Sequence, residues 1–410
     1  MTDTPVSTDT PASTDTTVSD DALRAEVRAW LKANYRPDDL KGATLWSSTP
    51  ETRAWLTKVL DAGWATPRWP AQWWGRSLPE HQARIVEREF AAVRAPGAGQ
   101  DRGNLYANTA MAYGNDVLKA GFVRGILTGE INMCLLYSEP GAGSDLAGIR
   151  TRADRKGEEY IINGQKVWTS GAMTADYGML IARTDWDAPK HGGISFYFLP
   201  MKQPGVAVRP LRQVTDEAHF NEVFITDAVC PADNRLGAEG AGWKVLQTAL
   251  AYERSVMGDG ARGPRNAGSK AGLLDLARES GKLNDPIVRQ DLARVIAYRR
   301  LNDLNNARAK ADIKEGTSSP IMSLGKLAMS RILHEEARLR TQLLGAASLL
   351  DGKDFPQADD ANFLTLNAYF TSIGGGTDQI QRNIIGERVL GLPKEPEVDR
   401  DVPFRDVRAG

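Results

Sequence analysis

The stretch from Tyr137 to Ala172 carries the residues of this chain whose types and spacing best fit a chemical role. It begins with SEPGAGSD at 138–145, a glycine-rich turn with serine hydroxyls and two acids, and ends near Trp168-Thr169-Ser170. Backbone N–H groups of such a turn can bind an anion, and an aromatic ring beside two hydroxyls can stack on a planar group. The pattern predicts a site for a planar cofactor that bears phosphate. The alternative is a surface loop beside a core tryptophan.

A second candidate is Glu253, which lies in the run Leu-Ala-Tyr-Glu-Arg at 250–254. The apolar residues that share its face at helical spacing are Leu246, Ala249, Leu250 and Met257. A carboxylate on such a stripe is either paired, for instance with Arg254, or has a raised pKa that suits a general base. Both interpretations remain open on the residues alone.

The elements that must position these residues form three blocks, preceded by a Thr/Ser/Asp/Pro-rich tail at 1–20. Residues 21–133 show helical spacing, with an amphipathic stripe at Leu23, Val27, Trp30 and Leu31. Further helices are expected at 52–62, 79–93 and 117–127, with a loop at 63–75 packed by tryptophans. This block is therefore interpreted as an N-terminal helical domain.

Residues 134–236 change towards a period of two, which predicts a small antiparallel β-domain. Strands are expected at 133–138, 160–162, 166–169, 177–184, 194–200, 206–209 and 221–226. Asn163-Gly164 would form a hairpin turn between the second and third of these, because both residues tolerate positive φ. The loops of this domain would carry the motif.

Residues 237–393 return to helices, expected at 242–262, 284–316, 319–345 and 376–390, with room for one more before 285. Long amphipathic helices in sequence favour an up-and-down four-helix bundle. Residues 394–410 would be a charged tail. The whole chain is therefore interpreted as α+β and mainly α.

Composition excludes several classes of function. The net charge of −1 gives no general attraction to nucleic acid or to an anionic membrane, and no apolar run is long enough to span one. Two cysteines and four histidines lack metal-ligand spacing, so no metal is expected. Residues 1–20 resemble neither a secretory signal nor a transit peptide, and a reducing cytoplasm is the expected compartment.

Three motifs in order resemble the acyl-CoA dehydrogenase family of flavoenzymes over residues 20–393: SEPGAGSD, INGQKVWTS and GGGTDQIQRNIIGERVLGLP. The resemblance implies a helical domain, a β-domain and a helical bundle, with FAD between the last two. It also implies removal of an α-proton and a β-hydride from an acyl-CoA thioester. The product would be a trans-2-enoyl-CoA, and the electrons would pass to an electron-transfer flavoprotein.

One position departs from the usual family pattern. Most members place the base glutamate directly before the Gly-Thr of the last motif, where this chain has Gly375. A minority carries the base on the first helix of the bundle, and Glu253 matches that position. The resemblance thus favours Glu253 as the base, with Tyr252 and Arg254 beside the substrate. Gly374 and Gly375 would leave room for a bulky, branched or ring-bearing acyl chain, and the backbone N–H of Gly375 would polarise the thioester carbonyl. Glycines that only permit a tight turn are the alternative.

The resemblance also implies the flavin contacts. Tyr137 and Ser138 would bind the isoalloxazine, and Trp168, Thr169 and Ser170 would pack around it. Gly143 and Ser144 would lie near the pyrophosphate or the CoA thioester. The remaining expected contacts are Arg278, Gln342, Gly345, Thr377 and Gln379. In the family some of these come from a neighbouring subunit, so a homo- or heterotetramer is expected.

Two other functions stay open. Gly375 and the altered glycine motif after Gln342 are also compatible with a non-catalytic subunit of a heteromeric dehydrogenase. An oxidase that reacts with oxygen is a weaker alternative that nothing in the sequence favours.

Overall fold

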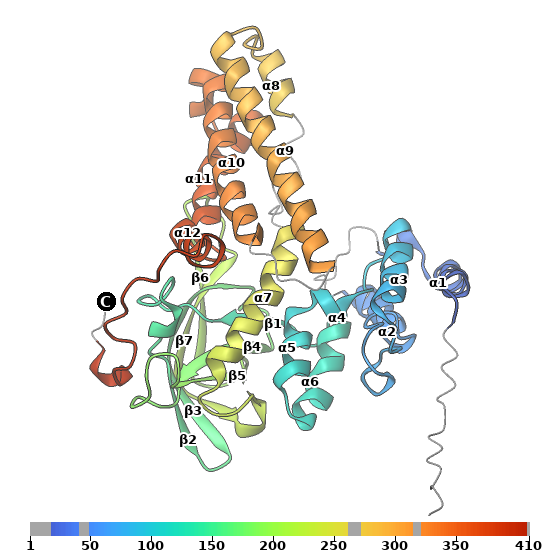
Figure 1. Ribbon diagram of the computed structural model, residues 1–410, viewed down its shortest axis with the longest axis vertical. Helices are drawn as coiled ribbons and strands as arrows, with labels where there is room; N and C mark the ends of the chain where they lie inside the picture. Colours follow the sequence, from blue (N-terminus) through green and yellow to red (C-terminus); the bar gives the residue numbers. More distant parts are fainter. Residues whose placement is uncertain (1–17, 41–48, 261–271, 315–320, 408–410) are drawn as a thin grey trace, which may run out of the picture. The chain divides into compact units, whose positions relative to one another are not determined.

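The computed structural model describes residues 18–40, 49–260, 272–314 and 321–407, without the side chains of 39, 253–260, 310, 312–314, 321 and 322 (Figure 1). Two compact units are present, Met1–Asn104 with Arg124–Glu130, and Leu105–Val123 with Ile131–Gly410. The second unit contains all the residues of the expected site. The three-domain division inferred from sequence remains a prediction.

The first unit is helical, as expected. Its elements are α1 (Asp20–Asn34), η1 (Pro37–Leu40), α2 (Pro50–Asp61), η2 (Ala71–Trp73), α3 (Glu80–Ala92) and α4 (Gln100–Gly103). The Ser19 hydroxyl caps α1 by accepting from the N–H of Ala22. The predicted stripe is buried at Leu23, Val27 and Leu31.

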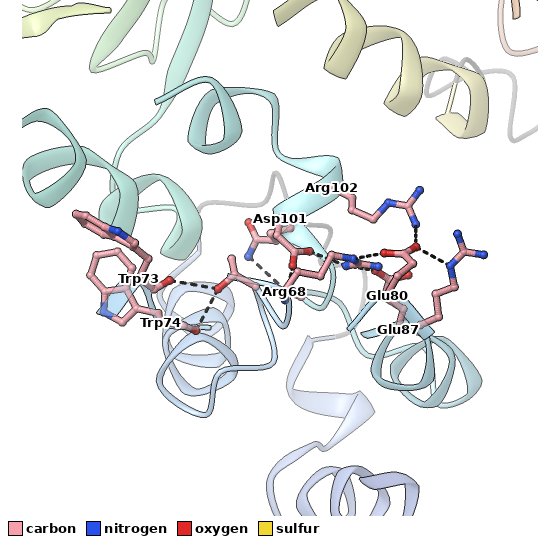
Figure 2. Close-up of polar contacts among 11 residues, drawn as sticks. Arg68, Trp73, Trp74, Glu80, Glu87, Asp101 and Arg102 are labelled. Carbon is pink, nitrogen blue, oxygen red and sulfur yellow. Dashed lines mark hydrogen bonds and ion pairs between the residues drawn. The ribbon is translucent and has the colours of Figure 1, made fainter. Parts of the chain in front are cut away.

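The loop at 63–75 is anchored by one aromatic ring and one arginine. Trp64 is 1% exposed and its ring lies 6.5 Å from that of Trp30. Figure 2 shows the guanidinium of Arg68 among three acids, with Nη1–oxygen distances of 2.8 Å to Glu87 and 3.0 Å to Asp101, and Nε donating to Glu80 at 2.6 Å. Burial raises the pKa of Asp101 despite these contacts. The loop is therefore a packed structural element.

The second unit is built on one eight-stranded sheet. Its strands are β1 (Met133–Leu136), β2 (Arg152–Lys156), β3 (Glu159–Ser170), β4 (Tyr177–Arg183), β5 (Ile194–Pro200), β6 (Val206–Leu211), β7 (Phe220–Pro231) and β8 (Arg235–Leu236). The strand order is β6-β7-β3-β2-β4-β5-β8, and β1 pairs with β4. Most pairs are antiparallel, as expected, but β1 and β2 both pair with β4 in parallel.

The hairpin predicted at Asn163-Gly164 is wrong. β3 runs without a break through both residues, and the turn falls earlier, at Gly157, where φ is +65° between β2 and β3. Asn163 is instead paired with Asp227 of β7, through its amide nitrogen at 3.0 Å and from the Asp227 N–H at 2.9 Å. Gly164 lies against Thr151, where a Cβ would come within 2.8 Å of the Thr151 Cα. Close backbone approach, and not a turn, explains this glycine.

Replacing Gly164 by alanine is expected to destabilise the fold by about 1–3 kcal/mol, because the added methyl group overlaps the backbone of Thr151. Gly121→Ala is the matched control, since no atom lies within 4 Å of the added carbon in helix α6 (Asp116–Thr128). Urea unfolding followed by circular dichroism measures both. Equal midpoints for the two variants would show that the strand accommodates the methyl group.

The helices of the second unit differ from the expected bundle in two ways. The long helices α9 (Pro286–Lys314), α10 (Ile321–Leu344) and α11 (Pro356–Ile373) run side by side (Figure 1), and α11 was missed from the sequence. Helix α7 (Gly242–Gly260), expected as the first bundle helix, packs on β5 and on α5 (Leu105–Tyr113). The further helix before 285 exists as α8 (Leu273–Glu279). The last motif forms α12 (Asp378–Ile384), followed by a π-helical turn at Ile385–Val389.

Part of the expected charged tail at 394–410 is bound to the fold, as the described residues up to 407 show. Phe404 is 1% exposed and begins a 3-10 turn, Phe404–Asp406, packed against the loop that joins β4 and β5. The burial of Phe404 was not predicted, because the surrounding sequence is mostly charged.

Candidate functional site

The glycine-rich loop is attached to β3 at its base. The Ser138 carbonyl accepts from the N–H of Val167 at 2.9 Å, and Glu139 and Ala142 exchange two backbone bonds of 3.0 and 3.1 Å. Gly143 and Ser144 lie at the exposed tip of this loop. Tyr137 turns its ring into the core, 7% exposed, so only its backbone is available to a ligand. The structure therefore joins the two ends of the predicted motif.

A buried ion pair contacts the start of this loop. Lys166 is fully buried and its Nζ donates to Glu139 Oε1 at 2.8 Å and to the Tyr137 carbonyl at 3.1 Å. Glu139 also accepts from the N–H groups of Arg150 and Thr151, at 2.7 and 2.9 Å. Burial raises the pKa of Glu139, but the charge of Lys166 and these hydrogen bonds outweigh it, so the pKa is lowered. Burial lowers the pKa of Lys166.

Trp168 is presented outward from the end of β3. It has φ of +62° and is 58% exposed, at a point where the register with β7 shifts. Such a backbone angle is unfavourable for a bulky residue and is typical of functional sites. The next residue, Thr169, is buried, and its hydroxyl has no hydrogen-bond partner among the described atoms. An exposed ring beside an unsatisfied hydroxyl fits a planar ligand with polar edges.

A line of aromatic rings connects Trp168 to the last motif. The Trp168 ring meets Phe220 edge-on at 5.9 Å, and Phe220 lies 5.5 Å from Phe370 of α11. Gly374 lies four residues after Phe370, and a Cβ there would lie 2.7 Å from the Phe370 ring. Gly375 and Gly376 have φ of +66° and +93°, which side chains rarely adopt. The predicted substrate turn is thus brought to the same side of the sheet as Trp168.

A chain of polar side chains fixes this turn. On α10, Ser330 is fully buried and lies 2.8 Å from both Ser372 Oγ and Asp378 Oδ2. His334 Nε2 is 2.7 Å from Ser372, and Lys326 Nζ donates to Asp378 at 3.3 Å. The network ties α10, the end of α11 and the start of α12 together, and Thr377 caps α12 by accepting from the N–H of Ile380.

Ser330→Ala is expected to lower the free energy of unfolding by about 1–3 kcal/mol, because Asp378 and Ser372 lose a buried partner. Ser348→Ala, which removes a hydroxyl from a 3-10 turn, should change it by at most about 1 kcal/mol. Chemical denaturation measures both variants. A midpoint for Ser330→Ala no lower than that of Ser348→Ala would mean that water replaces the hydroxyl at no cost.

The remaining predicted residues fall into two groups. Glu253 lies in α7, but its side chain and that of Arg254 are outside the described residues; Tyr252 before them is half-buried, and burial raises its pKa. Arg278 pairs with Asp275 in α8, Gln342 accepts from Arg338, and Gly345 has φ of +58°. Gln342 is twelve residues, about 18 Å of helix, from Ser330. Within one chain, Arg278, Gln342 and Gly345 therefore lie far from the turn at Gly374–Thr377. Gln379, just after this turn, is exposed.

The described part of the chain offers no group of three or more potential ligands for a metal ion. Both cysteines are buried and free. None of the described helices is long and apolar enough to cross a membrane.

Comparison with known proteins decides the family. Residues 134–228 match the model for the acyl-CoA dehydrogenase middle domain, and residues 240–390 match that for the acyl-CoA dehydrogenase C-terminal domain. The acyl-CoA dehydrogenase IpdE1 of Mycobacterium tuberculosis is 34% identical over 385 residues, which cover 92% of this chain and 98% of IpdE1. The chain belongs to the acyl-CoA dehydrogenase family.

Two solved structures share the fold of this acyl-CoA dehydrogenase family member. The Tcur3481-Tcur3483 steroid ACAD matches with a TM-score of 0.69 and 29% identity, over 92% of this chain and 98% of that one. The ChsE4-ChsE5 complex from Mycobacterium tuberculosis matches with a TM-score of 0.66 and 30% identity, over the same shares. The resemblance found in the sequence is confirmed, and the chain is an oxidoreductase of this generally FAD-dependent family.

Sequence reasoning missed residues that support the site. These are Lys166, which contacts Glu139 of the glycine-rich loop, Ser330, which contacts Asp378 of α12, and Phe370, which contacts Phe220. Lys326, Ser330 and His334 recur every four residues on one helix face, a polar stripe that could have indicated a buried network. Phe370 had no comparable signal, because its contact with Phe220 joins residues far apart in the sequence.

Proposed function

We propose that this chain is an FAD-dependent acyl-CoA dehydrogenase that converts an acyl-CoA thioester to its trans-2-enoyl-CoA, with Glu253 as the base. The observation that carries the proposal is the outward-facing Trp168, strained at φ of +62°, beside the unsatisfied hydroxyl of Thr169. When bound, the flavin supplies the acceptor for the hydride from the β-carbon. The residues of the chain supply binding, orientation and the proton acceptor.

The described residues offer two sets of contacts for the flavin, one around Trp168 and one around the glycine-rich loop. Trp168 would stack on the ring system, and Thr169 and Ser170 would donate to its polar edge, since the Thr169 hydroxyl has no other described partner. The N–H groups around Ser138, Gly143 and Ser144 would receive the ring or a phosphate. The rigid base beneath them, Lys166 with Glu139, limits movement of this loop and so favours a fixed cofactor geometry.

For the substrate, Glu253 would take the α-proton, and Tyr252 and Arg254 would line the same helix. The family's usual base position is Gly375, which keeps a backbone N–H for the thioester oxygen and has no side chain. The Gly374–Gly376 turn requires glycine, because two of its residues have positive φ, and so no side chain stands at the usual base position. A bulky, branched or ring-bearing acyl group fits this arrangement, and relatives described as a steroid ACAD support it.

We also propose that the active protein is a tetramer, of one chain or of two. Arg278, Gln342 and Gly345 lie at the other end of α10 from the Thr377 turn, so a second subunit would have to bring the two groups to one FAD. Large apolar side chains are exposed on α9 and α11, among them Ile287, Leu301 and Tyr369, as at an oligomer interface. The electrons would pass to an electron-transfer flavoprotein, and the proposed compartment is the cytoplasm.

The deciding experiment is anaerobic reduction. Purified protein should be yellow, and the visible flavin absorbance should bleach when an acyl-CoA is added. A panel of short, branched and sterol-like CoA esters identifies the substrate. A colourless protein that no added FAD restores would contradict the proposal.

A second function is favoured by Gly375 and by a relative solved as a complex of two chains, ChsE4-ChsE5. In this case the chain would be the non-catalytic subunit of a heteromeric dehydrogenase. It would then bleach only after a partner chain is added, and Glu253→Gln in this chain would leave the rate unchanged.

A further inference from the structure

The C-terminal residues 399–407, here called the strap, are bound to the sheet domain. The N–H of Phe404 donates to the Ala188 carbonyl at 3.1 Å and that of Arg405 to the Trp186 carbonyl at 3.0 Å. Pro403 forms a β-bridge with Pro189, and the Phe404 ring lies 5.6 Å from that of Trp186. The strap is therefore an ordered part of the fold.

The buried end of the strap rests on the arginine that holds the glycine-rich loop. The guanidinium of Arg183 lies 3.4 Å from the centre of the Phe404 ring and is fully buried. Its Nη2 donates to the Ala147 carbonyl at 2.7 Å and its Nε to the Ile149 carbonyl at 3.2 Å. Phe404 closes one face of Arg183, so the ring keeps water from that cation and fixes its donors on the loop.

Two further contacts join the strap to the same loop. Lys190 Nζ lies 2.6 Å from Asp145 of the loop and 3.6 Å from Asp399 of the strap. Arg150, at the end of the loop, donates to the Val407 carbonyl at 3.3 Å and lies 5.2 Å from the Phe404 ring. The loop is thus held at Asp145, Ala147, Ile149 and Arg150, in addition to its contact with Lys166.

We propose that the strap is a positioning element of the cofactor site. It holds residues 139–151 through Phe404 with Arg183, and through Asp399 with Lys190, in the conformation that binds FAD. The inference rests on the proposed function for its ligand. The exposed tip of the loop, Gly143 and Ser144, is loosely packed. No atom lies within 4 Å of a Cβ built at Gly141 or at Gly143. With so little packing of its own, the tip depends on the residues that grip its ends.

The test is Phe404→Ala in the full-length protein. Amide hydrogen exchange in the peptide 139–151 is expected to rise about tenfold, because the Arg183 donors lose their cover, while exchange in α9 and α10 stays the same. The dissociation constant for FAD, measured by quenching of flavin fluorescence, should rise by about tenfold as well. Val398→Ala, at a side chain 93% exposed just before the strap, is the matched control and should change neither readout.

Phe404→Trp tests whether an aromatic face restores the loop, and it should recover part of both effects. Asp399→Asn removes one contact without a buried cavity and should shift loop exchange in the same direction, which keeps the test valid if Phe404→Ala does not fold. Unchanged exchange in 139–151 in folded Phe404→Ala or in Asp399→Asn would overturn the proposal. If the wild-type protein binds no FAD, the proposed function fails, and the exchange measurement still decides the role of the strap.

Discussion

Glu253→Gln is expected to retain its flavin absorbance and to lose reduction by acyl-CoA, with the rate constant falling about 10²–10⁴-fold. Glutamine keeps the size and hydrogen-bonding of the side chain but cannot take up a proton. The proposed α-proton is only weakly acidic, so its removal needs a positioned carboxylate base. Anaerobic stopped-flow measurement of flavin bleaching gives the rate constant directly.

Glu158→Gln is the matched control for this substitution. Glu158 is an exposed carboxylate in the turn between β2 and β3, so its loss should leave the rate of bleaching unchanged. If Glu253→Gln is reduced as fast as the wild type, Glu253 is not the base. If it purifies without flavin while Glu158→Gln remains yellow, the carboxylate has a structural role in the assembled site.

The sequence predicted the cofactor motif because its chemistry is local. SEPGAGSD and the Trp168 run lie within one stretch, and residue type, spacing and the family resemblance indicate the same ligand. Most strands and helices also follow from local periodicity, for example β5 at Ile194–Pro200 and α3 at Glu80–Ala92. Local rules fail where a distant contact decides the outcome. Gly164 looks like a turn residue, but its contact with Thr151 places it inside a strand.

The support of the site could not be predicted for the same reason. In the sequence Lys166 is an ordinary strand residue, and its ion-pair partner Glu139 lies 27 residues earlier. Helix α11 was missed because polar and apolar residues alternate irregularly along 356–373 and form no clear amphipathic stripe. Phe404 lay in a stretch dominated by charge, and its binding site is formed by Arg183, more than two hundred residues away. The contacts of Lys166 and Phe404 join residues far apart in the sequence, and neither hydrophobic periodicity nor residue propensity reports such contacts.

Lys166→Met is expected to destabilise the protein by about 3–5 kcal/mol, the largest effect on stability predicted for this chain. Methionine can fill the volume of the lysine side chain, but Glu139 then remains 10% exposed and loses its one ion-pair partner among the described residues, keeping the N–H groups of Arg150 and Thr151 and the more distant charge of Arg183. Lys156→Met, on an exposed position of β2, should change stability by no more than about 0.5 kcal/mol. Urea unfolding measures both. A loss for Lys166→Met no larger than the control would mean that Glu139 becomes neutral in the fold at little cost.

The double variant Lys166→Met with Glu139→Gln separates the charge from the packing. It should recover part of the loss, because no unpaired charge is left buried.

The difference in stability between the double variant and the wild type should also depend on pH with a definite sign. The pKa of Glu139 is lowered in the fold, so its contribution is complete above the unfolded value of about 4.3 and disappears as pH falls through the folded value. The lowered pKa of Lys166 acts only at the alkaline end, where stability rises with pH because the unfolded chain binds the extra proton. Urea midpoints between about pH 3 and pH 8 should therefore differ by a constant amount above about pH 5 and converge below about pH 4; a gap that widens on acidification would show that the pair does not stabilise the loop through its charge.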